Sequence, residues 1–467
     1  NPDVLERAEM AAALRQQGGV CEVLGDVIDY HRREDKPVWW RMFDRAEASE
    51  EELRDDPGCI AGLTAVGEPE PVARSLQQWY AFDPDQECKL SGKETVMFSH
   101  DLDFKPSITA LDTVNGRVAL KASTASLRNH GGFPTGGSLI PHEVVNSAGI
   151  VAALTDLCRR QLEGQPLPAG VSSLLSRTPP SVPLRLPGES EVAAAQRVTA
   201  AMDGGCLVIQ GPPGTGKTYT ASRAIARLLA AGKRVGITSN SHKAILNLMS
   251  ACGEALEESG GVLVGIKAGG DSDDALAERY PGLRFVAGGA AAHGQYEGGV
   301  VGGTAWLFTR PEWEGELDYL FIDEAGQVPL ANAVAMARCA RNLVLLGDQM
   351  QLEQPVQGTH PGDAGMSVLQ YMLKDEHNSR PDAPVYYPVI PADKGLFLGT
   401  SRRMHPNVCR FISESIYDGR LEAYADCERQ RVQLGRRELI DVEAGIQFSA
   451  VEHEGNEHRY LLHTPTT

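Results

Sequence analysis

Hydrophobic and polar positions change their spacing along the chain of 467 residues, and these changes predict its elements. Over residues 4–14 and 20–30, apolar side chains recur every three or four positions, which is the spacing of amphipathic helices. From about residue 77 to 128, short alternating stretches such as 95–98 and 117–121 are separated by turn residues. This alternation is typical of antiparallel hairpins, and it predicts a small β-barrel after the first helices.

The spacing changes again in the second half of the chain. A helical pattern over 142–162, a proline-rich linker over 164–187 and a helix over 189–202 come first. Beyond them, apolar strand candidates alternate with helical segments, and these candidates cover 206–209, 234–238, 262–266, 300–303, 319–322 and 343–346. Such alternation is typical of an α/β fold with a parallel sheet covered by helices. The glycine-rich stretch 269–299 is expected to be a mobile surface excursion.

Residues 211–218 read Gly-Pro-Pro-Gly-Thr-Gly-Lys-Thr and lie between the strand 206–209 and a helical pattern over 221–231. Strand, glycine-rich loop and helix together form the context of a P-loop, so the sheet is of the RecA-like kind. Glycines let successive backbone N–H groups converge on phosphate oxygens, and the helix N-terminus adds partial positive charge. The segment therefore predicts nucleoside triphosphate binding, with ATP and Mg²⁺ as the ligands. The residues expected to contact the nucleotide here are Gly211, Pro212, Pro213, Gly214, Thr215, Gly216, Lys217, Thr218 and Tyr219.

Polar residues at the ends of two later strands extend this site. Lys217 is expected to reach the β- and γ-phosphates, while the Thr218 hydroxyl ligates Mg²⁺. Asp323 and Glu324 follow the strand 319–322, whose C-terminal end faces the P-loop. We expect Asp323 to hold the metal and Glu324 to orient or deprotonate the attacking water. Gln351, in the loop after the strand 343–346, could sense the γ-phosphate.

Composition narrows the class of protein. The chain is 42% hydrophobic and 23% charged, as in ordinary soluble globular proteins, and no apolar run approaches the ~20 residues of a membrane helix. None of the nine cysteines pair as Cys-x-x-Cys, so no zinc site, iron–sulfur cluster or disulfide framework is expected, and a cytoplasmic location fits best. The net charge of −18 argues against a protein that coats nucleic acid, although a local basic groove stays compatible with it.

Two further segments resemble motifs of the superfamily 1 helicases. The loop Gly-Asp-Gln-Met-Gln-Leu-Glu-Gln-Pro over 347–355 is similar to their third motif, with the proline one residue later than usual. The segment 398–406 resembles the Tyr-Arg-Met-His-Pro motif of the 5′→3′ branch, the group around the nonsense-mediated-decay RNA helicase and its DNA-acting relatives. This resemblance implies that Arg403 contacts the γ-phosphate. Arg402 takes the place of an aromatic residue that stacks on the base, and would stack through its guanidinium.

The same resemblance implies further contacts. Gln196 stands where the family keeps a glutamine that reads the adenine edge, although a solvent-facing helix glutamine would look the same. The segments 238–244 and 302–304 are similar to strand ends that touch the nucleic-acid backbone, where small donors and helix-start N–H groups suit phosphates. The nucleic-acid contacts expected from them are Ser239, Asn240, Ser241, Gly303 and Thr304.

The stretch His-Arg-Arg-Glu-Asp-Lys-Pro-Val-Trp-Trp over 31–40 allows two interpretations. Its tryptophans could stack on bases, or they could form a packed aromatic hinge beside a solvated charge run, which we favour. The stretch also resembles bacterial proteins in which a RecB-like nuclease precedes the helicase. That resemblance implies a nuclease upstream of Asn1, in a longer chain, and single-stranded DNA rather than RNA as the partner.

These patterns divide the chain into a helical stalk (1–75), a small β-barrel (76–130), a stalk helix with linker (131–188), a first RecA-like domain (189–390) and the start of a second (391–467). The family's last two motifs are not found, although a strand is expected over 446–451. We therefore expect this chain to bind ATP better than it hydrolyses it. The resemblance implies an ATP-dependent 5′→3′ helicase. Two alternatives stay open, namely a P-loop ATPase of another kind and an ATP-gated nucleic-acid clamp without turnover.

Overall fold

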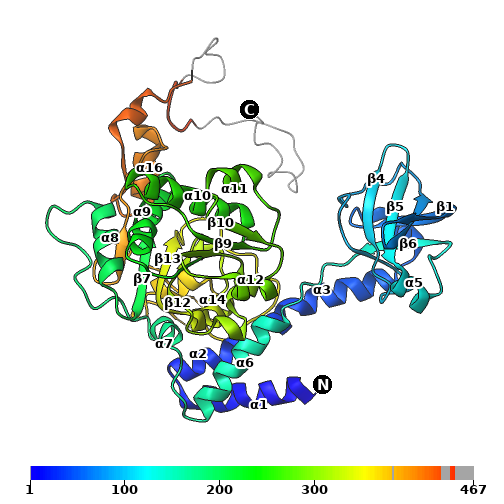
Figure 1. Ribbon diagram of the computed structural model, residues 1–467, viewed down its shortest axis with the longest axis horizontal. Coiled ribbons are helices and arrows are strands. Elements are labelled where there is room, and N and C mark those ends of the chain that lie inside the picture. The colour runs from blue at the N-terminus through cyan, green and yellow to red at the C-terminus, as the bar shows by residue number, and fades with distance from the viewer. Residues whose placement is uncertain (1, 381–382, 433–441, 448–467) are drawn as a thin grey trace, which may run out of the picture. The chain divides into compact units, whose positions relative to one another are not determined.

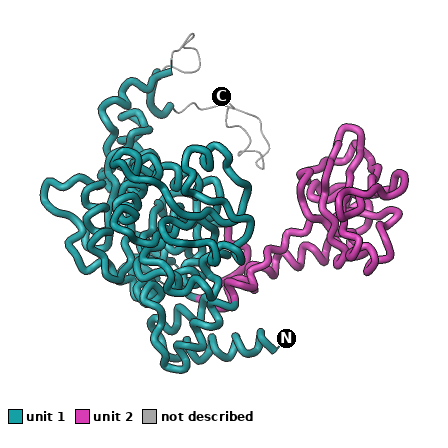
Figure 2. The backbone as a smooth tube through the Cα atoms, in the orientation of Figure 1, with its two compact units in different colours: residues 1–27, 152–354, 362–467 teal, residues 28–151, 355–361 magenta. Residues whose placement is uncertain are grey.

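The computed structural model describes residues 2–380, 383–432 and 442–447. The chain forms two compact units, the first from residues 1–27, 152–354 and 362–467, and the second from residues 28–151 and 355–361 (Figure 2). The first unit thus takes in the first two helices, α1 (Pro2–Gln17) and α2 (Val20–Val27), which the sequence pattern groups with the stalk. Within the described residues, no helix is both long and apolar enough to cross a membrane.

The first unit is built on an eight-stranded parallel sheet in the order β10-β9-β11-β8-β12-β13-β7-β14 (Figure 1). Its strands are β7 (Gly205–Gln210), β8 (Val235–Thr238), β9 (Gly265–Ala268), β10 (Leu283–Val286), β11 (Val300–Gly302), β12 (Leu317–Ile322), β13 (Ala340–Gly347) and β14 (Gly395–Phe397). This confirms the predicted α/β fold with a RecA-like parallel sheet. Two short strands, β15 (Thr400–Ser401) and β16 (Glu422–Ala423), pair separately.

Helices cover both faces of this sheet. Successive strand side chains point to opposite faces, so that Leu207 and Ile209 of β7 pack in one core with α8, α9 and α10, while β7 and β13 also contact α7. The helices of the first unit after α2 are α7 (Ala169–Leu175), α8 (Glu191–Ala201), α9 (Lys217–Ala230), α10 (His242–Glu258), α11 (Asp274–Arg279), α12 (Gly289–Gln295), α13 (Ala305–Phe308), α14 (Leu330–Met336), α15 (Val368–Leu373) and α16 (Pro406–Ile416). Helix α6 (Ala148–Leu162) begins among the residues of the second unit, six residues later than the pattern predicts. Single 3-10 turns cover Pro311–Trp313, Ala325–Gln327, Ala337–Cys339 and Ala425–Arg429.

Two expectations for this sheet are wrong. The stretch 269–299 is no loose excursion, because it forms α11, the edge strand β10 and α12, and β10 pairs with β9 over four residues. Strand β14 lies after the predicted boundary at residue 390, yet it pairs with β7 in the same sheet. Of the strand expected over 446–451, residues 448–451 lie outside the described residues.

The second unit contains a six-stranded antiparallel sheet in the order β3-β6-β1-β2-β5-β4. Its strands are β1 (Ile60–Val72), β2 (Ser75–Ala81), β3 (Val96–Phe98), β4 (Ser107–Asp112), β5 (Arg117–Ser123) and β6 (Gly136–Pro141). A bridge between Thr95 and Ser107 joins its two edges, so the sheet curls into a small barrel around buried residues such as Tyr80, Phe98 and Phe104. The barrel itself was predicted, but not its bounds, because β1 and β6 lie outside the expected range 76–130. The remaining helices are α3 (Tyr30–Glu47), α4 (Glu50–Asp55) and α5 (Thr124–His130).

The stretch 31–40 lies inside α3, so the favoured interpretation of a packed aromatic hinge is wrong. Trp40 is 67% exposed, and Trp39 stacks on Phe43 with ring centroids 5.9 Å apart. The charged residues at the start of the helix make contacts that the sequence does not reveal. They bind the segment 355–361, which belongs to the same unit.

Glu34 is the centre of this contact. Its carboxylate accepts hydrogen bonds from the backbone N–H groups of Gln357 (3.1 Å) and Gly358 (2.8 Å) and contacts His360 Nε2 at 2.6 Å. Pro37 has no N–H to donate to the Arg33 carbonyl one turn earlier, and Gly358 lies against that carbonyl, where an added Cβ would come within 2.6 Å of the oxygen. The segment 355–361 is thus fastened to α3 immediately after the loop that carries Gln351.

Replacing Glu34 with glutamine is expected to loosen this segment, because charge-assisted hydrogen bonds are about twice as strong as neutral ones. Hydrogen exchange at the Gly358 amide should become about tenfold faster, whereas Asp35→Asn, the same change one residue later, should leave it unaltered. Unchanged exchange in Glu34→Gln would rule out the anchoring role.

The contact should also depend on pH. Burial by itself raises the pKa of Glu34, but the hydrogen bonds from His360, Gly358 and Gln357 outweigh it and hold this pKa below its ordinary value of 4.5. The stabilisation is therefore present above that value and is lost as the pH falls through the lower pKa of the folded state.

Candidate nucleotide and nucleic-acid site

Four neighbouring strands of the parallel sheet, β12, β13, β7 and β14, deliver the predicted nucleotide residues to one edge. Parallel strands end at the same edge of a sheet, which is where ligands bind in α/β folds. The loops after these strands carry Asp323 and Glu324, Gln351, the P-loop, and Arg402 with Arg403. Segments that lie far apart in sequence are thereby brought together, as the hydrogen bond from the Gly211 amide to the Gly347 carbonyl shows (2.9 Å).

The P-loop has the backbone that phosphate binding requires. Gly214 and Gly216 have φ angles of +77° and +82°, which side chains other than hydrogen disfavour. Gly216 precedes α9 and has no side chain to cap it, so the first N–H groups of this helix point to the position of an anion. The Lys217 ammonium donates to the Gly211 carbonyl (2.8 Å), and an added Cβ at Gly211 would overlap with the stem of this lysine. These residues fit a nucleoside triphosphate.

Asp323 and Glu324 provide the acidic part of the site. Asp323 is only 7% exposed and accepts a hydrogen bond from the Glu324 amide (3.0 Å). Burial first, and then the charge of Glu324, raise the pKa of Asp323 to about 6, while Lys217 acts in the opposite direction. A buried carboxylate is stabilised by a cation, so its oxygens suit Mg²⁺. Glu324 itself has a φ of +51°, a left-handed conformation that is uncommon for this residue type and often found at functional sites.

Gln351 is held in place by two residues that sequence reasoning missed as functional. Its Nε2 donates to Asp348 Oδ2 (3.0 Å), and the same oxygen accepts a hydrogen bond from the Tyr417 hydroxyl (2.6 Å). Asp348 is 4% exposed and Tyr417 is 2% exposed. Burial and then the bond to Asp348 raise the pKa of Tyr417 above its ordinary value, so it stays a donor. Since Tyr417 directly follows α16, the hydrogen-bonded chain connects the end of this helix with Gln351. Asp348 belongs to the sequence motif over 347–355, whereas no sequence pattern indicated Tyr417.

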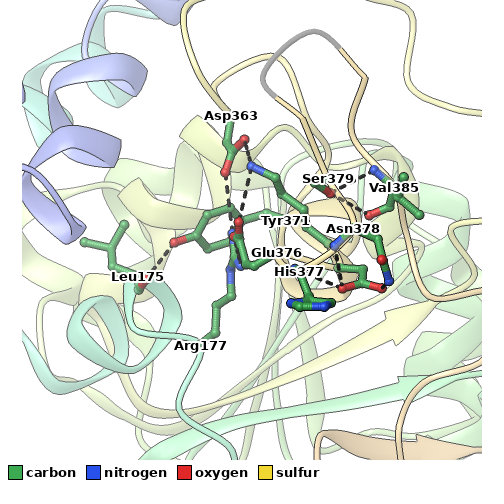
Figure 3. Close-up of polar contacts among 11 residues, drawn as sticks. Leu175, Arg177, Asp363, Tyr371, Glu376, His377, Asn378, Ser379 and Val385 are labelled. Carbon is green, nitrogen blue, oxygen red and sulfur yellow. Dashed lines mark hydrogen bonds and ion pairs between the residues drawn. The ribbon is translucent and has the colours of Figure 1, made fainter.

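Replacing Tyr417 with phenylalanine is expected to lower kcat for ATP hydrolysis about tenfold with little change in KM, because Asp348 loses one of the donors that orient it. Tyr371→Phe is the matched control, since Tyr371 is equally buried and donates one hydrogen bond, to the Leu175 carbonyl at 2.6 Å, in a polar cluster with Arg177 and Asp363 (Figure 3). Equal kcat values for the two variants would contradict the positioning role of Tyr417.

The segment 398–403 runs along the P-loop. The Arg402 amide donates to the Gly214 carbonyl (2.8 Å), the Ser401 hydroxyl donates to the Pro213 carbonyl (3.0 Å), and an added Cβ at Gly214 would overlap with Cβ of Arg403. This contact places the Arg403 backbone beside the phosphate-binding loop, where a guanidinium can reach phosphate oxygens. The prediction for Arg403 is thus consistent with its position.

A cavity of about 470 Å³ opens beside the P-loop and has room for a nucleotide base. It is lined by Ser190, Glu191, Val192, Thr215, Gly216, Tyr219, Thr220, Thr400 and Arg402. The Arg402 guanidinium lies 4.1 Å from the Tyr424 ring centre, so its planar face is already used in stacking. Gln196 does not line this cavity; its amide donates to the Arg223 carbonyl (3.2 Å), whereas Glu191, from the start of the same helix, does line it.

The residues predicted to touch nucleic acid lie at the ends of two adjacent strands, β8 and β11. Ser239 is buried, and the Asn240 amide donates to the Gln327 carbonyl (2.5 Å), so both side chains shape the loop before α10. The Gly303 amide donates to the Ile237 carbonyl (3.1 Å), and Thr304 precedes α13. Ser241 precedes α10 and is exposed. The starts of α10 and α13 therefore lie at this edge, next to the strand that ends at Asp323 and Glu324.

Comparison with known proteins finds a family model and distant relatives for part of the chain. Residues 190–364 match the family model of the AAA domain. The chain is 28% identical over 251 residues to the DNA replication ATP-dependent helicase/nuclease dna2 of Schizosaccharomyces pombe. The aligned region covers 51% of this chain and 16% of that protein. It is 26% identical over 220 residues to the protein of that description from Gallus gallus, covering 46% of this chain and 20% of the relative.

Solved structures of helicases are also similar. The Arterivirus nonstructural protein 10 (helicase), solved in complex with DNA, superposes with a TM-score of 0.34 and 13% identity, covering 77% of this chain and 59% of that one. The chain spans a fifth or less of the length of its two curated relatives. From the sequence matches, the chain carries an AAA-type, helicase-like P-loop domain that is distantly related to these helicase/nucleases.

Proposed function

We propose that this protein couples ATP hydrolysis to 5′→3′ movement along single-stranded DNA, as a helicase of superfamily 1. One observation supports the coupling most directly. The Asp323 amide donates to the Thr238 carbonyl (2.9 Å), and the Asn240 amide donates to the Gln327 carbonyl (2.5 Å). The loop with the catalytic carboxylates and the loop expected to hold the strand are therefore hydrogen-bonded to each other at both ends.

The residues of the site have separate roles in ATP hydrolysis. Lys217 and Arg403 neutralise phosphate charge, Glu324 accepts a proton from water, and Gln351 orients that water under the control of Asp348. Mg²⁺, when held by Thr218 and Asp323, would polarise the phosphate oxygens. A shift of the loop 323–327 during this chemistry is transmitted to residues 238–240, because the two loops share hydrogen bonds. The strand would be held through phosphates and thus without sequence preference.

Strand displacement on tailed duplexes tests the proposal. With ATP and Mg²⁺, the protein should displace the strand of a DNA duplex that has a single-stranded 5′ tail and leave a 3′-tailed duplex intact; a duplex of RNA should be a poorer substrate. Displacement from the 3′ tail would contradict the polarity, and equal activity on RNA would contradict the choice of DNA.

A further inference from the structure

A buried lysine contacts both segments that are expected to hold nucleic acid, at His242 and at Gly302. Lys267 is the third residue of β9 and is 1% exposed. Its Nζ lies 2.9 Å from His242 Nδ1 and donates to the carbonyls of Ala268 (3.1 Å) and Gly269 (2.7 Å). An ammonium has three protons to donate, so these three partners use all of them. Lys267 is therefore not itself available to a phosphate, and its position calls for another explanation.

The lysine determines which nitrogen of His242 carries the proton. An ammonium can only donate, so Nδ1 must be the acceptor and the proton of the neutral ring must be on Nε2. Burial first, and then the charge of Lys267, hold the pKa of His242 below its ordinary value of 6.5, which keeps the ring neutral at pH 7. Gly269 and Gly270 lie against the ring, and an added Cβ at Gly270 would come within 2.8 Å of its Cγ. The imidazole is thus fixed in both orientation and tautomer.

This fixed ring stands at the expected nucleic-acid edge. His242 is the first residue of α10, directly after Ser241, and it is partly exposed. The stem of Lys267 passes Gly302, where an added Cβ would come within 3.2 Å of Cδ, and Gly302 precedes Gly303 and Thr304. Among the described residues, none accepts a hydrogen bond from Nε2 of His242. The donor therefore lies at the N-terminus of α10, a helix of 17 residues whose first N–H groups also favour an anion.

We infer that His242 donates an Nε2–H hydrogen bond to a phosphodiester oxygen of the bound single strand, and that Lys267 is the positioning residue that sets this tautomer. The inference rests on the proposed function, because it assumes that this edge binds nucleic acid. The two basic residues thus have different roles. The neutral imidazole of His242 contacts the strand, whereas the ammonium group of Lys267 stays buried and does not contact it.

Binding of a fluorescent oligo-dT to the full chain tests the contact. His242→Asn should weaken binding about fivefold, which is the effect of losing one neutral hydrogen bond. The asparagine side-chain amide reaches only the position of Nδ1, so the donor at the position of Nε2 is lost. His242→Gln should retain most of the affinity, since its Nε2 can take the place of the ring donor. The salt dependence should be the same in both variants, because no charge is removed. Equal affinity of His242→Asn and the unaltered protein would overturn the inference.

Lys267→Met tests the positioning role. It should weaken binding, but by less than His242→Asn, because the ring can still carry its proton on Nε2. Combining Lys267→Met with His242→Asn should cause no further loss, and combining it with His242→Gln should leave the affinity of the glutamine variant unchanged. Additive losses would show a merely structural lysine. If Lys267→Met does not fold, ¹⁵N-histidine NMR of the unaltered protein can show which ring nitrogen of His242 carries the proton. A proton on Nδ1 would overturn the inference. If the unaltered protein does not bind oligo-dT at all, the proposed function itself fails.

Discussion

Glu324→Gln is expected to reduce kcat for ATP hydrolysis about 10²- to 10⁴-fold while ATP binding stays nearly unchanged. Glutamine has almost the same size and can hydrogen-bond to water, but it cannot accept a proton from it. Glu324 directly follows Asp323 after the end of β12 and has a left-handed backbone, and Asp323 is expected to hold the metal rather than to act as the base.

Single-turnover hydrolysis, together with binding of a fluorescent ATP analogue, separates the two effects. Glu316→Gln is the matched control, because Glu316 precedes the same strand at its opposite end, where its carboxylate forms an ion pair with Arg234 (3.1 Å). A kcat of Glu324→Gln within about threefold of the unaltered protein would show that another group is the base.

Arg403→Ala has the second large expected effect, a loss of about 10³- to 10⁵-fold in kcat, as for other arginines that stabilise a transferring phosphoryl group. Arg403→Lys should restore little, since an ammonium cannot form the paired hydrogen bonds of a guanidinium. The position beside Gly214 is the structural basis for this expectation.

Steady-state hydrolysis over a range of ATP concentrations measures this effect. Arg410→Ala is the control, because Arg410 is exposed on α16, the helix that begins three residues after Arg403. If Arg403→Ala changed only KM, the arginine would bind the ground state and have no special part in the transition state.

Much of the fold could be predicted because its signals are local. The P-loop follows an apolar strand and precedes a helix, and the alternation of strands and helices predicts a parallel sheet in which Asp323 and Gln351 lie near Lys217. The place of Arg403 was implied only by the resemblance to the helicase family. Short elements that depend on tertiary partners could not be predicted. Strand β10 has only four residues and lies in a glycine-rich stretch, so its sequence alone does not indicate a strand. It is stabilised by pairing with β9, which only the folded chain shows.

The contacts that position the site were also beyond the sequence. Tyr417 and Asp348 are 69 residues apart, and Lys267 and His242 are 25 apart, so only the folded chain shows that they meet. The charges over 31–36 look like a solvated run because their partners, 357–360, lie more than 300 residues away. The family resemblance places Gln196 at the adenine base, but in the structure its side-chain amide donates a hydrogen bond to the Arg223 carbonyl.

We propose that this sheet edge hydrolyses ATP in response to a single strand, and ATP turnover with and without single-stranded DNA measures this response. Single-stranded DNA should accelerate turnover, and the Lys217→Ala variant, measured in parallel, should show none. Turnover that is indifferent to DNA, or that survives the loss of Lys217, would contradict it.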